Sequence, residues 1–310
     1  MNLTRNRIFL LKSNNAFLQL HKNKSSKEKS SGSYCLESVK QHDYENFICT
    51  LLLDGKARST AFAVRSFNVE ISRVAGQVTQ STIGLMRMKF WEDMINSCYT
   101  KDFNRIPQHP VAIEIYKAVT SSNLTKRYFN NLIKSRTERF IDSSFTDMEA
   151  LENHSEKSVS NVYYLILEGS GVKHVNADHA ASHLGKAQGL IQQLRSTHLS
   201  RKLNFIPLPQ NLLVKYEISY EELLRCVPSE NLCDCSYEIA SRAHQHLEKA
   251  RSLLTTIPSE ARLVLLPAAA VQNYLDKLQK VGYDVLHPSL QKRTWGWIPK
   301  MWLNKTFNKY

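Results

Sequence analysis

One stretch of the chain, residues 83–99, carries a clear helical pattern. It reads Ile-Gly-Leu-Met-Arg-Met-Lys-Phe-Trp-Glu-Asp-Met-Ile-Asn-Ser-Cys-Tyr, and its large apolar side chains recur every three to four positions, at Met86, Phe90, Trp91, Met94 and Ile95. This spacing follows the 3.6-residue turn of an α-helix and not the alternation of a β-strand. The spacing therefore predicts an amphipathic helix over residues 83–99.

The same period continues on both sides of this stretch. In residues 59–75, for example, apolar side chains stand at core spacing at Phe62, Phe67, Ile71 and Val74. Alternating apolar runs bounded by turn residues are scarce, so no sheet is indicated. The sequence predicts a single all-α domain over residues 43–285, with further helices at residues 43–53, 111–121, 126–140, 147–169, 177–194, 220–226, 235–256 and 268–281.

Composition excludes several classes of protein. The longest strongly apolar run, residues 263–271, contains Pro267 and is far shorter than the ~20 residues of a membrane-spanning helix. The formal net charge of +13 is not accompanied by a zinc-finger, RRM or basic-zipper signature, so no nucleic-acid partner is predicted. The spacing of Cys226, Cys233 and Cys235 is not a familiar zinc pattern, and free thiols are expected there.

Both ends of the chain have a distinct composition. Residues 1–33 hold seven Lys/Arg and no acid before Glu28, which predicts a mitochondrial transit peptide followed by a polar linker; a disordered basic tail is the alternative. Residues 286–310 hold five Lys/Arg and no acid. This tail either lies at a membrane interface or packs on the helical body; the candidate interface residues are Trp295, Trp297, Trp302 and Lys300.

Several segments resemble the squalene/phytoene synthase family in order and spacing. The similar segments are residues 61–73, Phe90-Trp91, His109-Pro110-Val111, Leu184-Gly-Lys-Ala-Gln-Gly-Leu-Ile-Gln-Gln-Leu-Arg195 and Phe205-Ile-Pro207. The likeness extends over about residues 45–285. It implies a single-domain helical bundle of the isoprenoid synthase type.

The resemblance also implies where catalytic carboxylates should stand. Members of the family ionise a prenyl diphosphate with Mg²⁺ held by Asp-x-x-x-Asp motifs on facing helices. In this chain Ser196 and Ser200 take the second pair of positions, and Ser72 and Arg73 take the first, with Glu70 the one carboxylate left on that helix. A neutral hydroxyl is a poor ligand for a hard cation. We therefore expect no catalytic residue, no metal and no cofactor.

Two further sets of residues are candidates for ligand binding. Arg73 and Arg195 are predicted to contact a phosphate directly in place of the metal; the alternative is that Arg73 pairs with Glu70 three residues earlier. His179 and His183 share a helical face at a spacing that suits a metal. No third ligand is evident, so ordinary surface histidines are expected.

Within the family, four segments are similar to one non-catalytic branch of mitochondrial proteins that help to assemble respiratory complex I. These segments are residues 67–71, 83–91, 176–185 and 287–290. The resemblance implies action at the matrix face of the inner membrane. It implies complex I subunits or other assembly factors as partners, and peripheral contact with lipid. The alternatives are a prenyl- or phospholipid-binding module and a residual prenyl transferase.

Overall fold

The computed structural model describes residues 30–142, 144–203 and 205–310. The regular secondary structure of this part of the chain is helical, with only an isolated bridge between Phe145 and Pro209, which confirms the all-α prediction. The helices are α2 (Ser31–His42), α3 (Tyr44–Leu51), α4 (Gly55–Arg73), α5 (Ser81–Cys98), α6 (Pro110–Ser122), α7 (Lys126–Ile141), α8 (Met148–Ser155), α9 (Asn161–Gly169), α10 (Val175–Ser196), α11 (Ser200–Leu203), α12 (Gln210–Lys215), α13 (Tyr220–Arg225), α14 (Glu230–Ser252), α15 (Ser259–Val264), α16 (Ala268–Lys280) and α17 (Trp297–Thr306).

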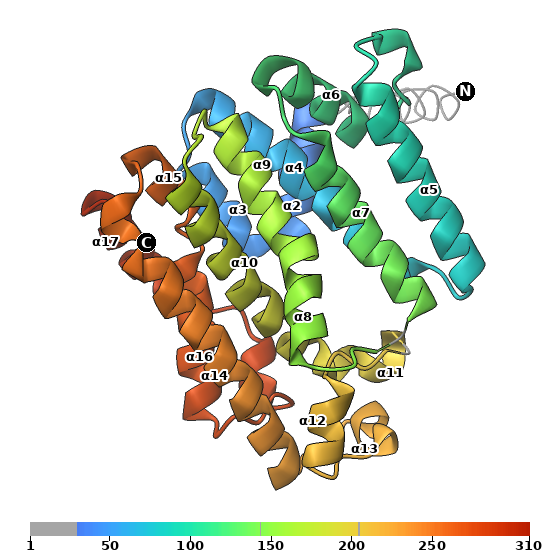
Figure 1. Cartoon of the computed structure of the whole chain (residues 1–310), viewed down its shortest axis with the longest axis vertical. Helices are drawn as coiled ribbons and strands as arrows, with labels where there is room; N and C mark the ends of the chain where they lie inside the picture. The colour runs from blue at the N-terminus through green and yellow to red at the C-terminus, as the bar shows by residue number, and fades with distance from the viewer. Residues whose placement is uncertain (1–29, 143, 204) are drawn as a thin grey trace, which may run out of the picture.

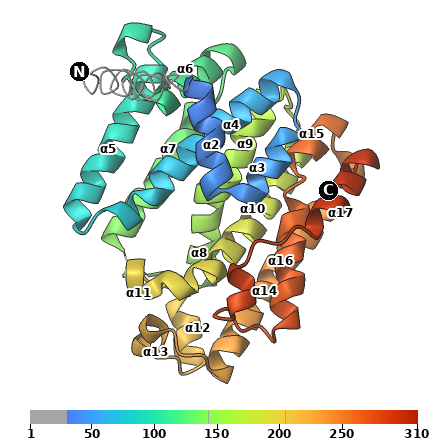
Figure 2. The same cartoon turned by 180° about the vertical axis from the view of Figure 1, so that it is seen from behind.

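The helices are arranged around a central group formed by α4, α9 and α10. Helix α5 lies along one side of the molecule, and α14 and α16 lie along the other (Figure 1). The view from behind shows α2 and α3 in front of α4 and α9 (Figure 2). Helix α10 packs against α8, α9, α14 and α16, so it joins the two sides of the molecule.

Helix α2 begins inside the segment predicted as a linker to residue 33. Ser30 is its N-cap, and the Ser30 side chain accepts a hydrogen bond from the backbone N–H of Ser33. Cys35 and Val39 are buried where α2 packs against α4 and α6. The sequence pattern did not predict the start of this helix, because its first residues are small and polar. The apolar side chains that pack on α4 and α6 come later, at Cys35 and Val39. The predicted transit peptide lies almost wholly outside the described residues.

The helix predicted over residues 147–169 is interrupted by one π-turn, Glu156–Ser160. The Asn161 side-chain amide donates to the backbone carbonyls of Glu156 and Lys157, at 2.9 and 3.0 Å. These bonds satisfy carbonyls at the wide turn. A π-turn inserted in a helix is a local feature that apolar periodicity does not reveal.

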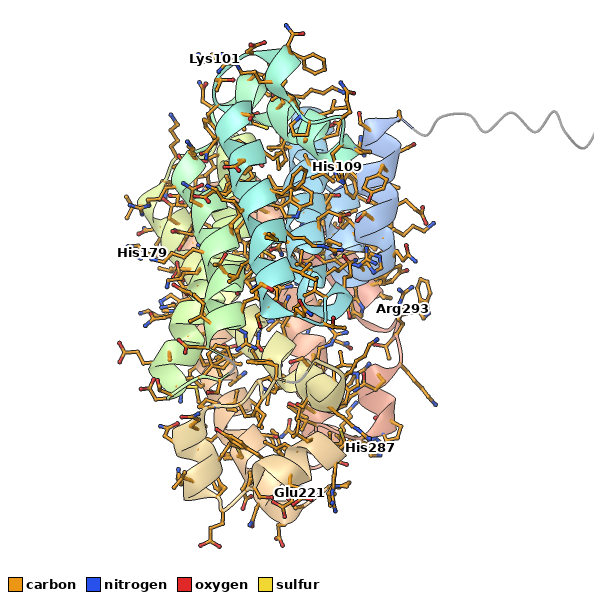
Figure 3. All side chains as sticks on the ribbon, turned by 90° about the vertical axis from the view of Figure 1, so that its right-hand side faces the viewer. Lys101, His109, His179, Glu221, His287 and Arg293 are labelled. Carbon is orange, nitrogen blue, oxygen red and sulfur yellow. The ribbon has the colours of Figure 1, made fainter. Side chains whose placement is uncertain are left out.

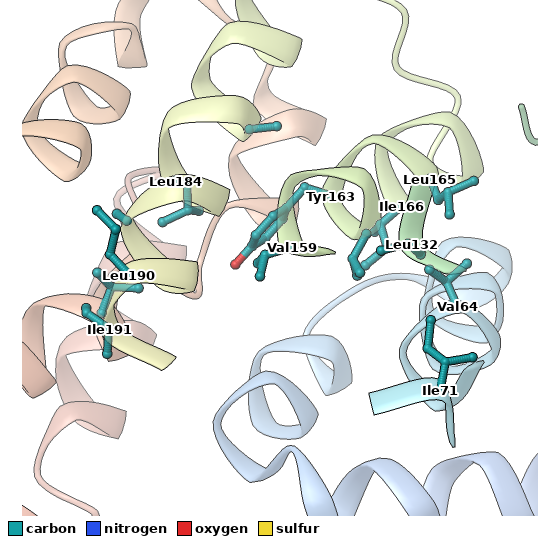
Figure 4. Close-up of a cluster of buried hydrophobic side chains, with 14 of the residues drawn as sticks. Val64, Ile71, Leu132, Val159, Tyr163, Leu165, Ile166, Leu184, Leu190 and Ile191 are labelled. Carbon is teal, nitrogen blue, oxygen red and sulfur yellow. The ribbon is translucent and has the colours of Figure 1, made fainter. Parts of the chain in front are cut away.

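The core joins side chains from α4, α7, α9 and α10 (Figure 4). Phe67 lies edge-on to Trp91 and Phe129, with ring centroids 5.7 and 5.5 Å away. Such edge-to-face pairs add about 0.5–1.5 kcal/mol each to the burial of the rings. The four side chains predicted at core spacing in residues 59–75 are all buried: Phe62, Phe67, Ile71 and Val74.

The apolar face of α5 differs from the prediction. Trp91, Met94 and Ile95 are buried as their spacing suggests, but Met86 is 73% exposed and Phe90 is 44% exposed. Met88 takes the buried position instead, one turn before Trp91. This helix carries apolar side chains on more than one of its sides. The 3.6-residue spacing therefore predicted the helix but not which side faces the core.

Two glycines let α10 approach the segment from α8 to α9 closely. A Cβ added at Gly185 would come within 2.5 Å of Ser160 Cα, and one at Gly189 within 2.9 Å of Ser155 Cα. Both obstacles are backbone atoms, which cannot rotate away as a side chain can. Beside this contact, the Glu156 carboxylate accepts hydrogen bonds from Ser160 and Ser182, at 2.9 and 2.7 Å.

We predict that Gly185→Ala lowers the free energy of unfolding by about 1–3 kcal/mol, because the added methyl group forces α10 away from Ser160. Urea denaturation of the purified protein measures the change. The matched control is Gly32→Ala in α2, where no atom lies within 4 Å of the new methyl group. That control should stabilise the protein by up to about 1 kcal/mol. Equal stability of Gly185→Ala and the wild-type protein would contradict the close contact.

Candidate functional site

A cavity of about 610 Å³ opens where the C-terminal ends of α4, α7 and α10 come together. Its walls also include α8, α11 and the segment from Ala75 to Ser81. Ser72 from α4 and Ser196 from α10 both line it. The structure thus brings together one residue from each of the two predicted motifs, Ser72 and Ser196, although they are 124 positions apart in the sequence.

The serine hydroxyls at the motif positions are engaged locally. Ser72 donates to the carbonyl of Val69 at 2.9 Å, and Ser196 donates to that of Gln193 at 2.9 Å. Ser200 is buried and donates to the carbonyl of Thr197 at 2.7 Å. Each hydroxyl therefore donates to a carbonyl three residues earlier in the chain, and Ser200 does not line the cavity.

Arg195 does not take the predicted phosphate-binding position. Its guanidinium lies 3.2 Å from the Glu45 carboxylate and 5.6 Å from the ring centroid of Tyr274. These partners lie on α3 and α16, and Arg195 is not part of the cavity wall. An ion pair already satisfies this cation. This placement corrects the prediction that it faces a ligand across from Arg73.

Arg73 and Glu70 also lie outside the cavity lining. Glu70 accepts a hydrogen bond from the Tyr34 hydroxyl of α2 at 2.9 Å, instead of pairing with Arg73. Burial, aided by the Glu70 carboxylate, raises the pKa of Tyr34 to about 12. The last carboxylate on α4 therefore serves a contact between α2 and α4.

The charged residues that do line the cavity are cations. Arg136 and Arg139 enter from α7, Lys202 enters from α11, and the buried imidazole of His154 enters from α8. Burial lowers the pKa of Arg136 to about 10; burial and the neighbouring Arg136 lower that of Arg139 to about 8. Burial and both guanidinium groups hold the pKa of His154 well below its usual value, so its ring is neutral.

This lining does not fit a Mg²⁺ ion. Mg²⁺ prefers oxygen ligands, carboxylates above all, in a tight octahedron. None of the described residues that line the cavity is an acid, and two guanidinium groups would repel a cation there. More generally, the described residues contain no group of three His, Cys, Asp or Glu side chains placed to hold a metal ion.

Sequence reasoning missed Arg136 and Arg139, although the sequence carried a signal. Phe129, Leu132 and Ile133 form the buried face of α7, and Arg136 continues that face one turn later. A charged residue at a core position is uncommon unless it has a partner or a function. The predicted motif positions lie on α4, α10 and α11 or just beyond their ends, and none of them lies on α7.

His183 lies beside a histidine of another helix, His246, and not beside His179 alone as the sequence spacing suggests. Its Nδ1 lies 2.9 Å from Nδ1 of His246 on α14, while His179 is exposed at the surface (Figure 3). The Nε2 of His246 lies 3.4 Å from the Glu152 carboxylate, which also accepts from Arg242. Burial, and then the charge of His246, lower the pKa of His183 to about 4. The pair therefore connects α10 to α14 as neutral rings.

The C-terminal tryptophans have two different environments. Trp297 is only 3% exposed, and its Nε1 donates to the carbonyl of Thr294 at 3.0 Å. It packs with Met301 in a small cluster against α3 and α16, which corrects its assignment as an interface residue. Trp295 and Trp302 are 63% and 52% exposed, and Lys300 is exposed. No described helix is long and apolar enough to cross a membrane.

The family model for squalene/phytoene synthases matches residues 39–296. The chain belongs to the squalene/phytoene synthase family. Two solved structures of similar fold are a dehydrosqualene synthase and the squalene synthase of Alicyclobacillus acidocaldarius. The first has a TM-score of 0.74 at 14% identity and covers 89% of this chain and 96% of its own. The second has a TM-score of 0.70 at 16% identity and covers 82% and 94%.

Sequence relatives in this family carry a different name from the synthases. The protein of Bos taurus called NADH dehydrogenase (ubiquinone) complex I, assembly factor 6 is 43% identical over 262 residues, which are 84% of this chain and 77% of that protein. Its Homo sapiens counterpart is 42% identical over the same share. A Dictyostelium discoideum homolog of that factor is 33% identical over 90% of this chain and 78% of its own. This member of the squalene/phytoene synthase family is thus a homologue of those assembly factors.

We predict that His183→Gln makes the stability of the protein depend less on pH between about 6.5 and 4. In this range the unfolded His183 binds a proton that the folded one resists, so its lowered pKa costs stability as the pH falls. Urea denaturation at pH 7, 6 and 5 measures the slope. The exposed His179→Gln is the control and should keep the wild-type slope. A wild-type slope in His183→Gln would contradict the neutral pair.

Proposed function

We propose that this protein is a non-catalytic assembly factor for respiratory complex I that acts at the matrix face of the inner mitochondrial membrane. The observation that carries the proposal is identity of 42–43% to mammalian complex I assembly factors 6 over 84% of the chain. The likeness extends to a Drosophila melanogaster homolog at 39%. Because the solved synthases share only 14–16% identity with the chain, they support the fold and not the activity.

The cavity supports the non-catalytic part of this proposal. Serines stand at the motif positions that reach the cavity, and the charged groups around it are Arg136, Arg139 and Lys202. Ionisation of a prenyl diphosphate with Mg²⁺ needs carboxylate ligands, which this lining does not provide. Binding of a prenyl or phospholipid molecule without chemistry does not need that metal. The lining therefore opposes the residual transferase but not a lipid-binding role.

The proposed compartment and partners rest on composition and on the relatives. Residues 1–29 are basic and have one acid, Glu28, which supports import into mitochondria. The relatives' name supports complex I subunits or other assembly factors as partners. We propose peripheral contact with the membrane through α17, where Trp302, Leu303 and Phe307 are exposed beside Lys300.

In cells of the source organism that lack this protein, we predict reduced assembly of complex I, and recovery when the full chain is re-expressed. Native gel electrophoresis of solubilised mitochondria measures the assembled complex. A chain that begins at Ser30 should not restore assembly, because it lacks the import signal. The matched control is the same shortened chain fused to an established mitochondrial presequence, which should restore it.

Two results would contradict the proposal. Normal complex I in cells without the protein would remove the assembly role. Release of diphosphate from farnesyl diphosphate by the purified protein with Mg²⁺, above a heat-denatured control, would remove the non-catalytic part.

We predict that the purified protein floats with vesicles that contain cardiolipin and that Trp302→Ser with Phe307→Ser weakens this binding about tenfold or more, because two exposed rings no longer enter the lipid. Val214→Ser, which removes a 79% exposed apolar side chain from α12, is the control and should bind as the wild type does. Equal loss in both variants, or no flotation of the wild type, would contradict a membrane contact through α17.

A further inference from the structure

Two arginines of α7 meet the cavity without a counter-charge. Arg136 and Arg139 stand three residues apart, so one helical face carries both toward the same space. Among the described residues, neither guanidinium forms an ion pair with an acid. Within the described residues, the side-chain hydrogen bond of Arg136 goes from Nη2 to the side-chain oxygen of Asn68, at 3.5 Å.

Part of each guanidinium is buried and has no hydrogen-bond partner. Nε of Arg136 and Nη1 of Arg139 are both shielded from solvent, and neither has a hydrogen-bond partner in the part of the chain that the structure describes. A buried donor without a partner is costly, and a buried charge without a counter-charge is more so. Burial lowers the pKa of both arginines, and the charge of Arg136 adds to this effect at Arg139.

Aromatic rings hold one of these cations in place. The Arg139 guanidinium lies over the ring of Phe205 and 4.6 Å from the ring centroid of Phe145. The two rings are in turn edge-on to each other, with centroids 5.8 Å apart. Stacking on a ring leaves the in-plane N–H groups of a guanidinium free to donate. Arg139 is therefore positioned in advance of any ligand.

We propose that this cavity binds a phosphate group directly through Arg136 and Arg139, without a metal ion. Each guanidinium presents a planar fork of donors that matches phosphate oxygens, and two of them balance a charge of about −2. Lys202 adds a third cation at the wall. The phosphate comes from one of two sources, a free phosphate or the head group of a phospholipid.

The size and the remaining walls of the cavity are consistent with either source. Its volume of about 610 Å³ falls in the range of roughly 300–1,000 Å³ that is usual for small-molecule sites. Ile71, Val78 and Phe140 give it an apolar side next to the arginines. A head group would lie at Arg136 and Arg139 with its chain along these residues, whereas a free phosphate would use the arginines alone.

The test is calorimetric titration of the full-length protein in EDTA with three probes. They are inorganic phosphate, dioctanoyl phosphatidate, which carries an exposed phosphate, and dioctanoyl phosphatidylcholine, in which a choline covers it. The variants are Arg136→Gln and Arg139→Gln. The matched control is Arg127→Gln, which removes an exposed arginine from the same helix.

We expect phosphate and phosphatidate to bind the wild type and Arg127→Gln, and phosphatidylcholine to bind neither. Each of Arg136→Gln and Arg139→Gln should weaken binding about tenfold or more, because charge-assisted hydrogen bonds are lost. If the affinity for phosphatidate is much higher than that for inorganic phosphate, the ligand is a phospholipid head group. Equal affinities identify free phosphate.

Three results would overturn the proposal. The first is no binding of phosphate or phosphatidate to the wild type, which decides the question even if a variant does not fold. The second is binding that appears only when Mg²⁺ replaces EDTA. The third is binding by both Arg136→Gln and Arg139→Gln as tight as in Arg127→Gln. None of these results bears on complex I assembly, so the two proposals fail separately.

Discussion

The close packing of α10 on the segment from α8 to α9 determines where the other parts of this protein lie. Gly185 and Gly189 permit it, because any side chain there would meet the backbone of Ser160 or Ser155. The contact fixes the direction of a helix of 22 residues, and so it fixes the position of Ser196 at its far end. Without it, the ends of α4, α7 and α10 would not enclose one cavity.

Polar bonds at the same contact explain why it tolerates a π-turn. Glu156 accepts from Ser160 and Ser182, and Asn161 satisfies carbonyls at the widened turn. A wide turn in a helix costs regular hydrogen bonds, and here side chains replace them. The glycines and this polar cluster thus act together, the first by removing side chains and the second by satisfying the backbone.

The cavity lies between α4 and α10, which carry the predicted motif positions, and its described charged side chains are cations. A site for a metal and a diphosphate needs acids on α4 and α10, yet serines stand there, and the cations enter from α7 and α11. Arg195 pairs with Glu45, and Glu70 accepts a hydrogen bond from Tyr34, so both side chains make contacts between helices. A lining without acids and with two guanidinium groups is physically consistent, since unopposed guanidinium groups and a bound Mg²⁺ would repel each other.

The helical period and a few segments in the sequence by themselves determined the fold class and the family. Those features depend on neighbours along the chain, where spacing is fixed by helix geometry. Only the tertiary structure decided that Met88 and not Met86 faces the core, that Trp297 is buried, that His183 meets His246, and that Arg136 and Arg139 share a cavity with Ser72 and Ser196. These outcomes depend on which side of a helix meets residues far away in sequence, and local spacing carries no information about that choice.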